Sequence, residues 1–195
     1  MDIESFAEDT RSPRERMLAG DLYISDNELA ADRLRALTLS AQYNATAAAD
    51  CQERRRLLTE LLGSVGQATE IRAPLYCDYG YQISIGSRTF INFGLVALDV
   101  ATITIGDDVQ IGPNVQLLTP THPVEAGLRR AKWEAARSIT IGDNVWLGGG
   151  AIVLPGITIG ENTVVGAGTV VTTDLPANVV TVGNPARVVR HLQAS

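Results

Sequence analysis

Cysteine, histidine and aromatic residues are scarce in this sequence of 195 residues. It contains two cysteines and two histidines, and only 5% of its residues are aromatic. Cys51 and Cys77 form no C-x-x-C pair, so we expect free thiols in a reducing compartment, the cytoplasm. A catalytic zinc ion usually has about three protein ligands, with histidine prominent. Two histidines do not meet that need, and we expect no metal requirement.

Long apolar runs and an excess of basic residues are also missing. No run of about 20 apolar residues occurs that could cross a membrane, and the charged N-terminus carries no apolar leader. The net charge is −6 and no basic stripe is present, which argues against nucleic-acid binding. We therefore expect a soluble cytoplasmic protein that binds neither membranes nor nucleic acids.

The first third of the sequence, residues 1–66, has the pattern of a helical cap. Ser12, Pro13 and Glu15 supply a capping residue, a first-turn proline and a capping box. Leucines at helical spacing follow, with charged residues between them, and Gly63 is expected to cap the last helix. From residue 67 the apolar residues alternate as they do in strands.

A six-residue repeat dominates residues 67–182. It is unbroken at Ile141, Leu147, Val153, Ile159, Val165 and Val171, and the same register appears earlier at Ile105, Ile111 and Leu117. A loop at 118–138 therefore fills a gap without losing phase, whereas the register slips by two residues between Ile85 and Ile105. A period of six fits neither a helix nor a flat sheet and is typical of a parallel β-helix, with the aliphatic position pointing inward. An ordinary meander would not give so many consecutive matches.

The segment TPTHPVEAG, which interrupts the repeat, contains His122. Pro120 and Pro123 restrict the backbone on both sides, and we expect the hydroxyls of Thr119 and Thr121 to hold the loop through hydrogen bonds. Imidazole accepts protons near neutral pH, and loops on rigid scaffolds often carry function. His122 is therefore a candidate general base; a surface histidine without a role is the alternative.

The C-terminal segment, residues 183–195, leaves the repeat and carries Arg187 and Arg190. Two arginines three residues apart can bind a phosphorylated ligand, and a basic tail without a role is the alternative. The glycines form no phosphate-binding loop, because they occupy the corners of the repeat. Trp146 stands at the end of an expected strand, where it either lines a ligand site or simply faces outward.

Several segments resemble a known family. The stretch IGDNVWLGGGAIVLPGITIGENTVVGAGTVV, with GNPARVV after it, resembles the hexapeptide-repeat acyltransferases. MLAGDLY, FINFGLVALDV and IGPNVQLLTPTHP are similar to the maltose and galactoside O-acetyltransferase branch. The resemblance implies a mainly β fold, a left-handed parallel β-helix of hexapeptide repeats with an N-terminal α-helical segment. It implies a C-terminal tail that contacts coenzyme A.

The resemblance also implies an activity and a site. It implies transfer of the acetyl group of acetyl-CoA to a hydroxyl of a sugar or related polyol, in a homotrimer whose sites lie between subunits. His122 is the implied general base, and Asn92 would contact the acceptor and steady the charge of the transition state. The other implied residues are Ser25, Asp26, Asp78 and Asp99 for the acceptor, and Trp146, Gly149, Ala167, Thr172, Arg187 and Arg190 for the cofactor.

The departures from the family pattern all lie on the acceptor side. Gly94 stands where asparagine is common, YISDNEL is one residue short, and Asp78 stands where a close relative has serine. The acceptor therefore stays open, and a non-sugar acceptor is one alternative. A non-catalytic β-helix scaffold is another. γ-Carbonic anhydrases share the fold but need three zinc-binding histidines, which this sequence lacks.

Overall fold

The computed structural model describes residues 9–193 and begins with three helices. They are α1 (Pro13–Ala19), α2 (Asn27–Ala45) and α3 (Cys51–Leu61). At the start of α1 the Ser12 hydroxyl accepts from the backbone N–H of Glu15, and the Glu15 carboxylate accepts from the N–H of Ser12, which confirms the capping box. The carboxylates of Asp26 and Asp50 cap α2 and α3 by accepting from the backbone N–H groups of Leu29 and Glu53.

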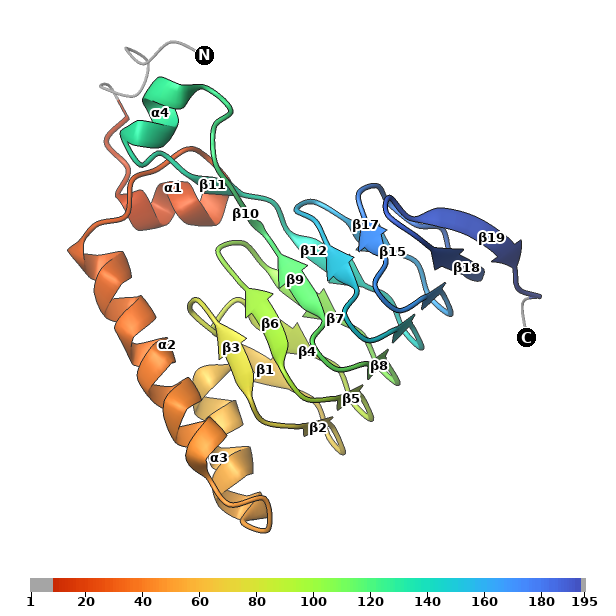
Figure 1. Cartoon of the computed structure of the whole chain (residues 1–195). Helices are drawn as coiled ribbons and strands as arrows, with labels where there is room; N and C mark the ends of the chain where they lie inside the picture. Colours follow the sequence, from red (N-terminus) through yellow and green to blue (C-terminus); the bar gives the residue numbers. More distant parts are fainter. Residues whose placement is uncertain (1–8, 194–195) are drawn as a thin grey trace.

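Short parallel strands then wind into a β-helix with three sheets (Figure 1). The first sheet contains β1 (Ser64–Val65), β4 (Ile83–Ile85), β7 (Ile103–Ile105), β12 (Ile139–Ile141) and β15 (Thr158–Ile159). The second contains β2 (Glu70–Ile71), β5 (Phe90–Ile91), β8 (Gln110–Ile111), β13 (Trp146–Leu147), β16 (Val164–Val165), β18 (Val179–Val182) and the antiparallel β19 (Arg187–His191). The third contains β3 (Leu75–Cys77), β6 (Leu95–Leu98), β9 (Gln116–Leu118), β14 (Ile152–Val153) and β17 (Val170–Val171).

The six-residue repeat corresponds to one side of this prism. Its aliphatic position points inward: Ile141, Leu147 and Val153, one from each sheet, are all buried in a single core. The corners require left-handed backbone or close approach. Asn144 has φ of 54°, a conformation that asparagine tolerates, and a Cβ on Gly160 would lie 2.3 Å from the backbone nitrogen of Ala177. The predicted fold is therefore confirmed together with the reason for its periodicity.

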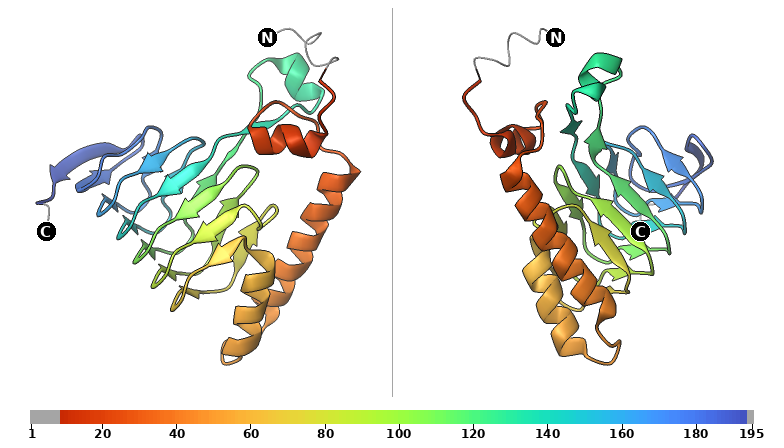
Figure 2. Two further views of the ribbon diagram at one scale, coloured as in Figure 1. Left: turned by 180° about the vertical axis from the view of Figure 1, so that it is seen from behind. Right: turned by 60° about the vertical axis from the view of Figure 1, so that its left-hand side comes forward.

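The helices α2 and α3 cover the first coils of the prism, whereas β19 lies at its other end (Figure 2). Tyr43 of α2 donates its hydroxyl hydrogen to the carbonyl of Ile71, and the Asn44 amide bonds both backbone groups of Leu75. Gly63 is not the cap of α3, because Leu62 occupies that position. A Cβ on Gly63 would instead lie 2.4 Å from the Tyr81 carbonyl oxygen.

The two cysteines are both free, Cys51 exposed and Cys77 buried. Within residues 9–193, no helix combines the length and the apolar character that crossing a membrane would need.

Candidate active site

One corner of the prism departs from the regular coil three times in succession. A regular coil has eighteen residues, as the pairing of Thr140 with Thr158 shows. The turns from the third sheet back to the first are longer at residues 78–82, 99–102 and 119–138. We call these three stacked turns the site corner. The register slip between Ile85 and Ile105 is explained by the two additional residues in the second of them.

The largest of these turns, residues 119–138, is a folded loop. β10 (Pro120–Thr121) pairs with β11 (Ala135–Ala136), and α4 (Ala126–Arg130) lies between them. The predicted hydroxyl bonds are confirmed. Thr119 donates its Oγ1 hydrogen to the Leu98 carbonyl at 2.7 Å, and Thr121 donates to the Ala135 carbonyl at 3.2 Å. The loop is therefore anchored at its base.

The loop is also tied to the N-terminal segment. The backbone groups of Tyr23 and Glu134 exchange two hydrogen bonds of 2.9 and 3.0 Å. This bridge holds the residues that precede α2 against the loop. His122, which follows β10, is exposed at the resulting boundary.

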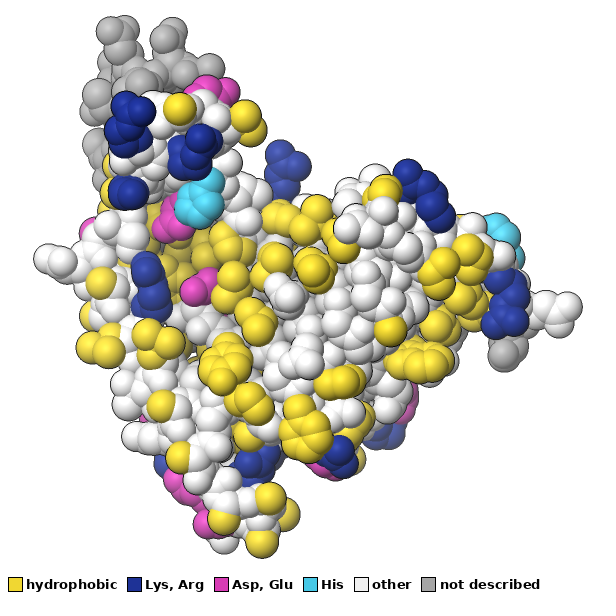
Figure 3. Space-filling view, viewed as in Figure 1, with side chains coloured by type: hydrophobic (Ala, Val, Ile, Leu, Met, Phe, Trp, Pro, Cys, Tyr) yellow, Lys and Arg dark blue, Asp and Glu magenta, His cyan; other side chains and the backbone are white. Residues whose placement is uncertain are grey.

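A cavity of about 610 Å³ opens between these two segments. It is lined by Ile24, Ser25, Arg33, His122, Arg129, Lys132 and Glu134. Figure 3 shows the hollow between the N-terminal segment and the loop that carries α4, with apolar side chains at its base and basic ones around its rim. A volume of this size holds a small ligand such as a sugar.

Buried tyrosines lie close to the cavity. Tyr23, Tyr79 and Tyr81 belong to, or pack against, one apolar cluster that is separate from the core of the prism. The guanidinium of Arg33 lies 5.9 Å from the centroid of the Tyr79 ring, which supports its position at the cavity wall. Burial raises the pKa of Tyr79. The phenol therefore stays protonated near neutral pH.

Two of the expected acceptor residues, Asp78 and Asp99, lie in the site corner. Asp99 has no exposed surface, and its carboxylate accepts from the backbone N–H groups of Asp78, Tyr79 and Gln82 at 3.0, 2.8 and 3.2 Å. Burial raises the pKa of Asp99 to about 6, although its backbone hydrogen bonds oppose this shift. Asp99 therefore shapes the turn at 78–82 and is not exposed to the cavity.

The pKa of Asp78 is raised as well, by burial first and by the Glu134 charge, while Arg33 lowers it. The charges of Arg33 and Glu134, which line the cavity, therefore act on the Asp78 carboxylate. Of the expected N-terminal pair, the structure brings only Ser25 to the cavity wall, where its Oγ accepts from Arg33 Nη2 at 2.9 Å. Asp26 accepts from the N–H of Leu29 and caps α2.

Sequence reasoning missed four charged residues of the cavity: Arg33, Arg129, Lys132 and Glu134. Arg33 has the pattern of a solvated helix face, and the other three lie in a loop without periodicity. The one available signal was the concentration of charge in the segment LRRAKWE, close to His122 in sequence.

Asn92 lies across the third sheet from His122. It follows β5, at the corner between the second and third sheets, and its Oδ1 accepts from the Phe93 N–H at 2.9 Å. The turns that contain Gly149 and Ala167 stack at that same corner. The structure therefore separates Asn92 from His122 within one chain.

The remaining expected cofactor residues are exposed on the surface of the prism. Trp146 stands outward on β13 with 55% of its surface exposed, and Thr172 follows β17. Arg187 and Arg190 lie on β19, both exposed. Residues 9–193 contain no group of three or more histidine, cysteine or acidic side chains that could hold a metal ion.

Comparison with known proteins gives concordant results. Residues 16–66 match the maltose acetyltransferase hexapeptide capping motif, and residues 138–173 match the bacterial transferase hexapeptide of six repeats. The chain is 49% identical over 180 residues to Nodulation protein L of Rhizobium meliloti (strain 1021), covering 92% of this chain and 98% of that protein.

Two solved structures extend the comparison. A maltose O-acetyltransferase from Clostridium difficile 630 superimposes with a TM-score of 0.93 at 43% identity, covering 95% of this chain and 100% of that one. A galactoside acetyltransferase in complex with coenzyme A gives 0.91 at 40% identity, covering 94% and 92%.

The fold and the site corner define an acyltransferase built on a left-handed β-helix of hexapeptide repeats. Within that class, the capping motif and the similarity over nearly the whole chain are decisive. The chain belongs to the maltose and galactoside O-acetyltransferase family.

Proposed function

We propose that this protein transfers the acetyl group of acetyl-CoA to a hydroxyl of a sugar or related small polyol, with His122 as general base. The observation that carries the proposal is the cavity beside His122, between the N-terminal segment and the largest of the three turns that leave the regular coil. Its polar lining suits an acceptor rich in hydroxyls. The relatives that act on maltose and galactosides support the same acceptor class.

The proposed reaction needs one base and no change of oxidation state. The imidazole of His122 removes the hydroxyl proton as the acceptor oxygen attacks the thioester carbonyl carbon. The carbon–sulfur bond then breaks, and the imidazolium returns the proton to the leaving thiolate. The products are an acetyl ester and free coenzyme A.

Asp99 and Ser25 would act by positioning in this scheme. Asp99 fixes the backbone of residues 78–82 and therefore the Asp78 carboxylate, which would accept hydrogen bonds from acceptor hydroxyls. Ser25 would hold Arg33 at the wall of the cavity. Asp26, as the cap of α2, would fix the position of Ser25.

A complete site would need two copies of the chain. Between Asn92 and Asp99 the backbone crosses the third sheet, and at about 3.3 Å per residue that corresponds to roughly 20 Å. Asn92 therefore cannot reach an acceptor that contacts His122 of the same chain. Asn92 of a neighbouring copy could reach that acceptor. The third sheet has the Asn92 corner at one edge and the site corner at the other, so two prisms packed along this sheet would bring the two corners together.

The outer face of the third sheet supports this assembly. Most of its outward positions are apolar, as at Val96, Ile152 and Val170, whereas the first sheet presents Thr104 and Thr140. Figure 3 shows the apolar side chains spread over β3, β6, β9 and β14. Contact between prisms along this face would cover it, and a homotrimer closes such contacts by rotational symmetry.

In the same assembly acetyl-CoA would lie along the coils. Gly149 and Ala167 would contact the pantetheine arm through their backbones, and Trp146 and Thr172 would line its path. Arg187 and Arg190 on β19 would bind the phosphates, which suits two exposed arginines that pair with Val182 and Val180, two residues apart on β18.

Thiol release from acetyl-CoA, measured against a panel of sugars and glycosides, tests the proposal. We expect release with at least one sugar, and His122→Ala should lower kcat about a hundredfold or more, as removal of a general base does. His191→Ala, which removes the other exposed histidine, is the matched control and should retain activity. Unchanged release in His122→Ala would exclude His122 as the base, and no release with any acceptor would contradict the proposed function.

A further inference from the structure

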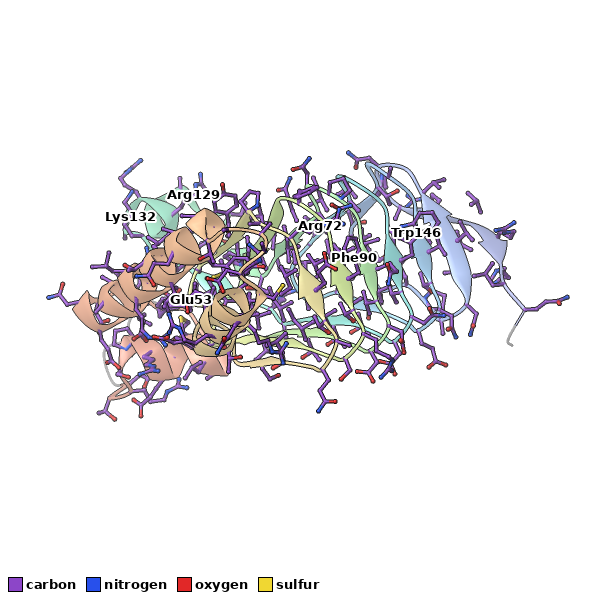
Figure 4. The ribbon with its side chains drawn as sticks, turned by 90° about the horizontal axis from the view of Figure 1, so that it is seen from below. Glu53, Arg72, Phe90, Arg129, Lys132 and Trp146 are labelled. Carbon is purple, nitrogen blue, oxygen red and sulfur yellow. The ribbon has the colours of Figure 1, made fainter. Side chains whose placement is uncertain are left out.

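The cavity beside His122 has a charge opposite to that of the whole protein. The chain carries a net charge of −6, yet three cations and one carboxylate line the cavity. The cations are Arg33, Arg129 and Lys132, and the carboxylate is Glu134. In Figure 4, Arg129 and Lys132 lie at the end of the molecule that carries α4 and the helices, away from Trp146. A neutral sugar gives no reason for this excess of positive charge.

Arg33 has its compensation within the protein. It contacts Ser25 at 2.9 Å and stacks over Tyr79, and the charges of Asp78 and Glu134 act on it. Although burial lowers its pKa, the Tyr79 contact and these two carboxylates raise it. The protein therefore supplies Arg33 with a hydroxyl acceptor, an aromatic ring and two carboxylates whose charges favour its charged form.

Arg129 and Lys132 have a different environment from Arg33, although none of these three cations forms a salt bridge within residues 9–193. Arg129 directs Nη1 to the carbonyl oxygens of Pro123 and Val124, at 2.9 and 2.8 Å, which uses one nitrogen of its guanidinium group. A guanidinium has five N–H donors, so most of those of Arg129 stay available to a ligand.

The backbone of Lys132 is a second and independent observation. Its φ is 71°, in the left-handed region, and it follows the C-cap of α4. Glycine is the usual residue at this position of a helix end, because a side chain there is strained. A lysine in such a position, with its side chain at the cavity, indicates that the ammonium group has a use.

We propose that the acceptor carries an anionic group, a carboxylate, sulfate or phosphate, that Arg129 and Lys132 bind while a hydroxyl of the same molecule faces His122. This inference rests on the proposed function and names the substrate class more narrowly. Glu134, which lines the cavity, and Asp78 would accept hydrogen bonds from the hydroxyls of the sugar ring. The carboxylates would also repel an anion from the inner wall, which fixes the orientation of the acceptor.

Matched acceptors with and without an anionic group test this inference. The neutral probe is methyl glucoside. The anionic probes are glucose 1-phosphate and glucuronic acid, which carry their charge at opposite ends of the sugar ring. We expect kcat/KM to be at least about tenfold higher with an anionic probe than with the neutral one, as charge-assisted hydrogen bonds predict. Raising the ionic strength should reduce this preference, because exposed charges are screened.

Variants of the loop identify the source of the preference. Lys132→Gly removes the ammonium group and relieves the backbone, and it should lower the ratio of anionic to neutral kcat/KM several-fold. Lys132→Arg keeps the charge and should keep the ratio. Arg130→Ala is the matched control, because Arg130 is an exposed cation of α4, two residues before Lys132, and does not line the cavity.

Three outcomes would overturn the inference. Equal kcat/KM for charged and neutral acceptors would overturn it and leave sugar O-acetylation intact. A higher KM for acetyl-CoA in Lys132→Gly, with the acceptor ratio unchanged, would assign the cations to the coenzyme phosphates instead. No transfer to any probe, charged or neutral, or to any member of the wider sugar panel would overturn both the inference and the proposed function.

Discussion

Mixed assemblies of two inactive variants provide the sharpest test of a site shared between copies. His122 lies at one edge of the third sheet and Asn92 at the other. We expect His122→Ala and Asn92→Ala alone each to lower the activity about a hundredfold, since one lacks the base and the other lacks a contact to the transition state. A site formed by His122 of one copy and Asn92 of the next is intact when the first copy is Asn92→Ala and the second is His122→Ala.

The number of recovered sites follows from the symmetry of the assembly. In a closed ring of three copies that contains both variants, one of the three sites receives both intact residues. Purified mixed trimers should therefore show about one third of the wild-type activity, against about one hundredth for either variant alone. A mixed dimer would recover about one half, so the recovered fraction also reports the number of copies.

The assay uses two copies of the gene with different affinity tags, expressed together and purified over both tags in succession. Thiol release from acetyl-CoA is then measured per mole of assembly, with doubly tagged wild type as the reference. Each variant carrying both tags alone controls for residual activity. If His122 and Asn92 acted within one chain, every chain in the mixture would lack one of them, and the absence of any recovery would refute the shared site.

Three further predictions concern the coil, the site corner and the tail. Gly160→Ala should lower the free energy of unfolding by about 2–4 kcal/mol, because the new Cβ would lie 2.3 Å from the backbone nitrogen of Ala177. Gly127→Ala is the control: its Cβ would meet nothing within 4 Å, so the substitution should be neutral or slightly stabilising. Urea titrations measure both. The pKa of Asp99 is raised from 3.8 to about 6, so the folded protein holds this proton more tightly than the unfolded chain does. The free energy of unfolding should therefore fall by about 3 kcal/mol as the pH rises from about 4 to about 6. Asp99→Asn should remove this pH dependence. Arg187→Ala and Arg190→Ala should each raise KM for acetyl-CoA about tenfold with little change in kcat, measured by steady-state kinetics.

The fold could be predicted because the repeat depends on one geometric property, the direction in which each sixth side chain points. Every sixth residue points into the core, so aliphatic side chains at Ile141, Leu147 and Val153 fix the three sides of the prism without information from elsewhere in the chain. The helical cap was equally local, since Ser12 and Glu15 interact over three residues. The error at Gly63 has the opposite origin, because that glycine is required by the approach of the Tyr81 carbonyl from a later turn.

The site could be predicted only in part, for the same physical reason. The loop that carries His122 to the cavity was identifiable because it breaks a regular pattern. Arg33, Lys132 and Glu134 were not, because the cavity exists only once the Tyr23–Glu134 bridge brings two distant segments together. No periodicity records such a juxtaposition. The burial of Asp99 was also hidden, since its partners are backbone groups of a turn one coil earlier.

The position of the three long turns explains how a rigid prism can carry loops of different length. The additional residues, two in the first coil, two in the second and eighteen in the third, all enter between the third and first sheets, and Ile103, Ile105, Ile139 and Ile141 still pair in register. The core is therefore unaffected by the length of the loop at 119–138, whose ends are joined where the Arg137 N–H donates to the Thr119 carbonyl at 3.0 Å. Lengthening such a loop costs only about 0.6 kcal/mol for each doubling. Substitutions at residues of this loop such as Lys132 can thus accumulate while the coil stays as it is.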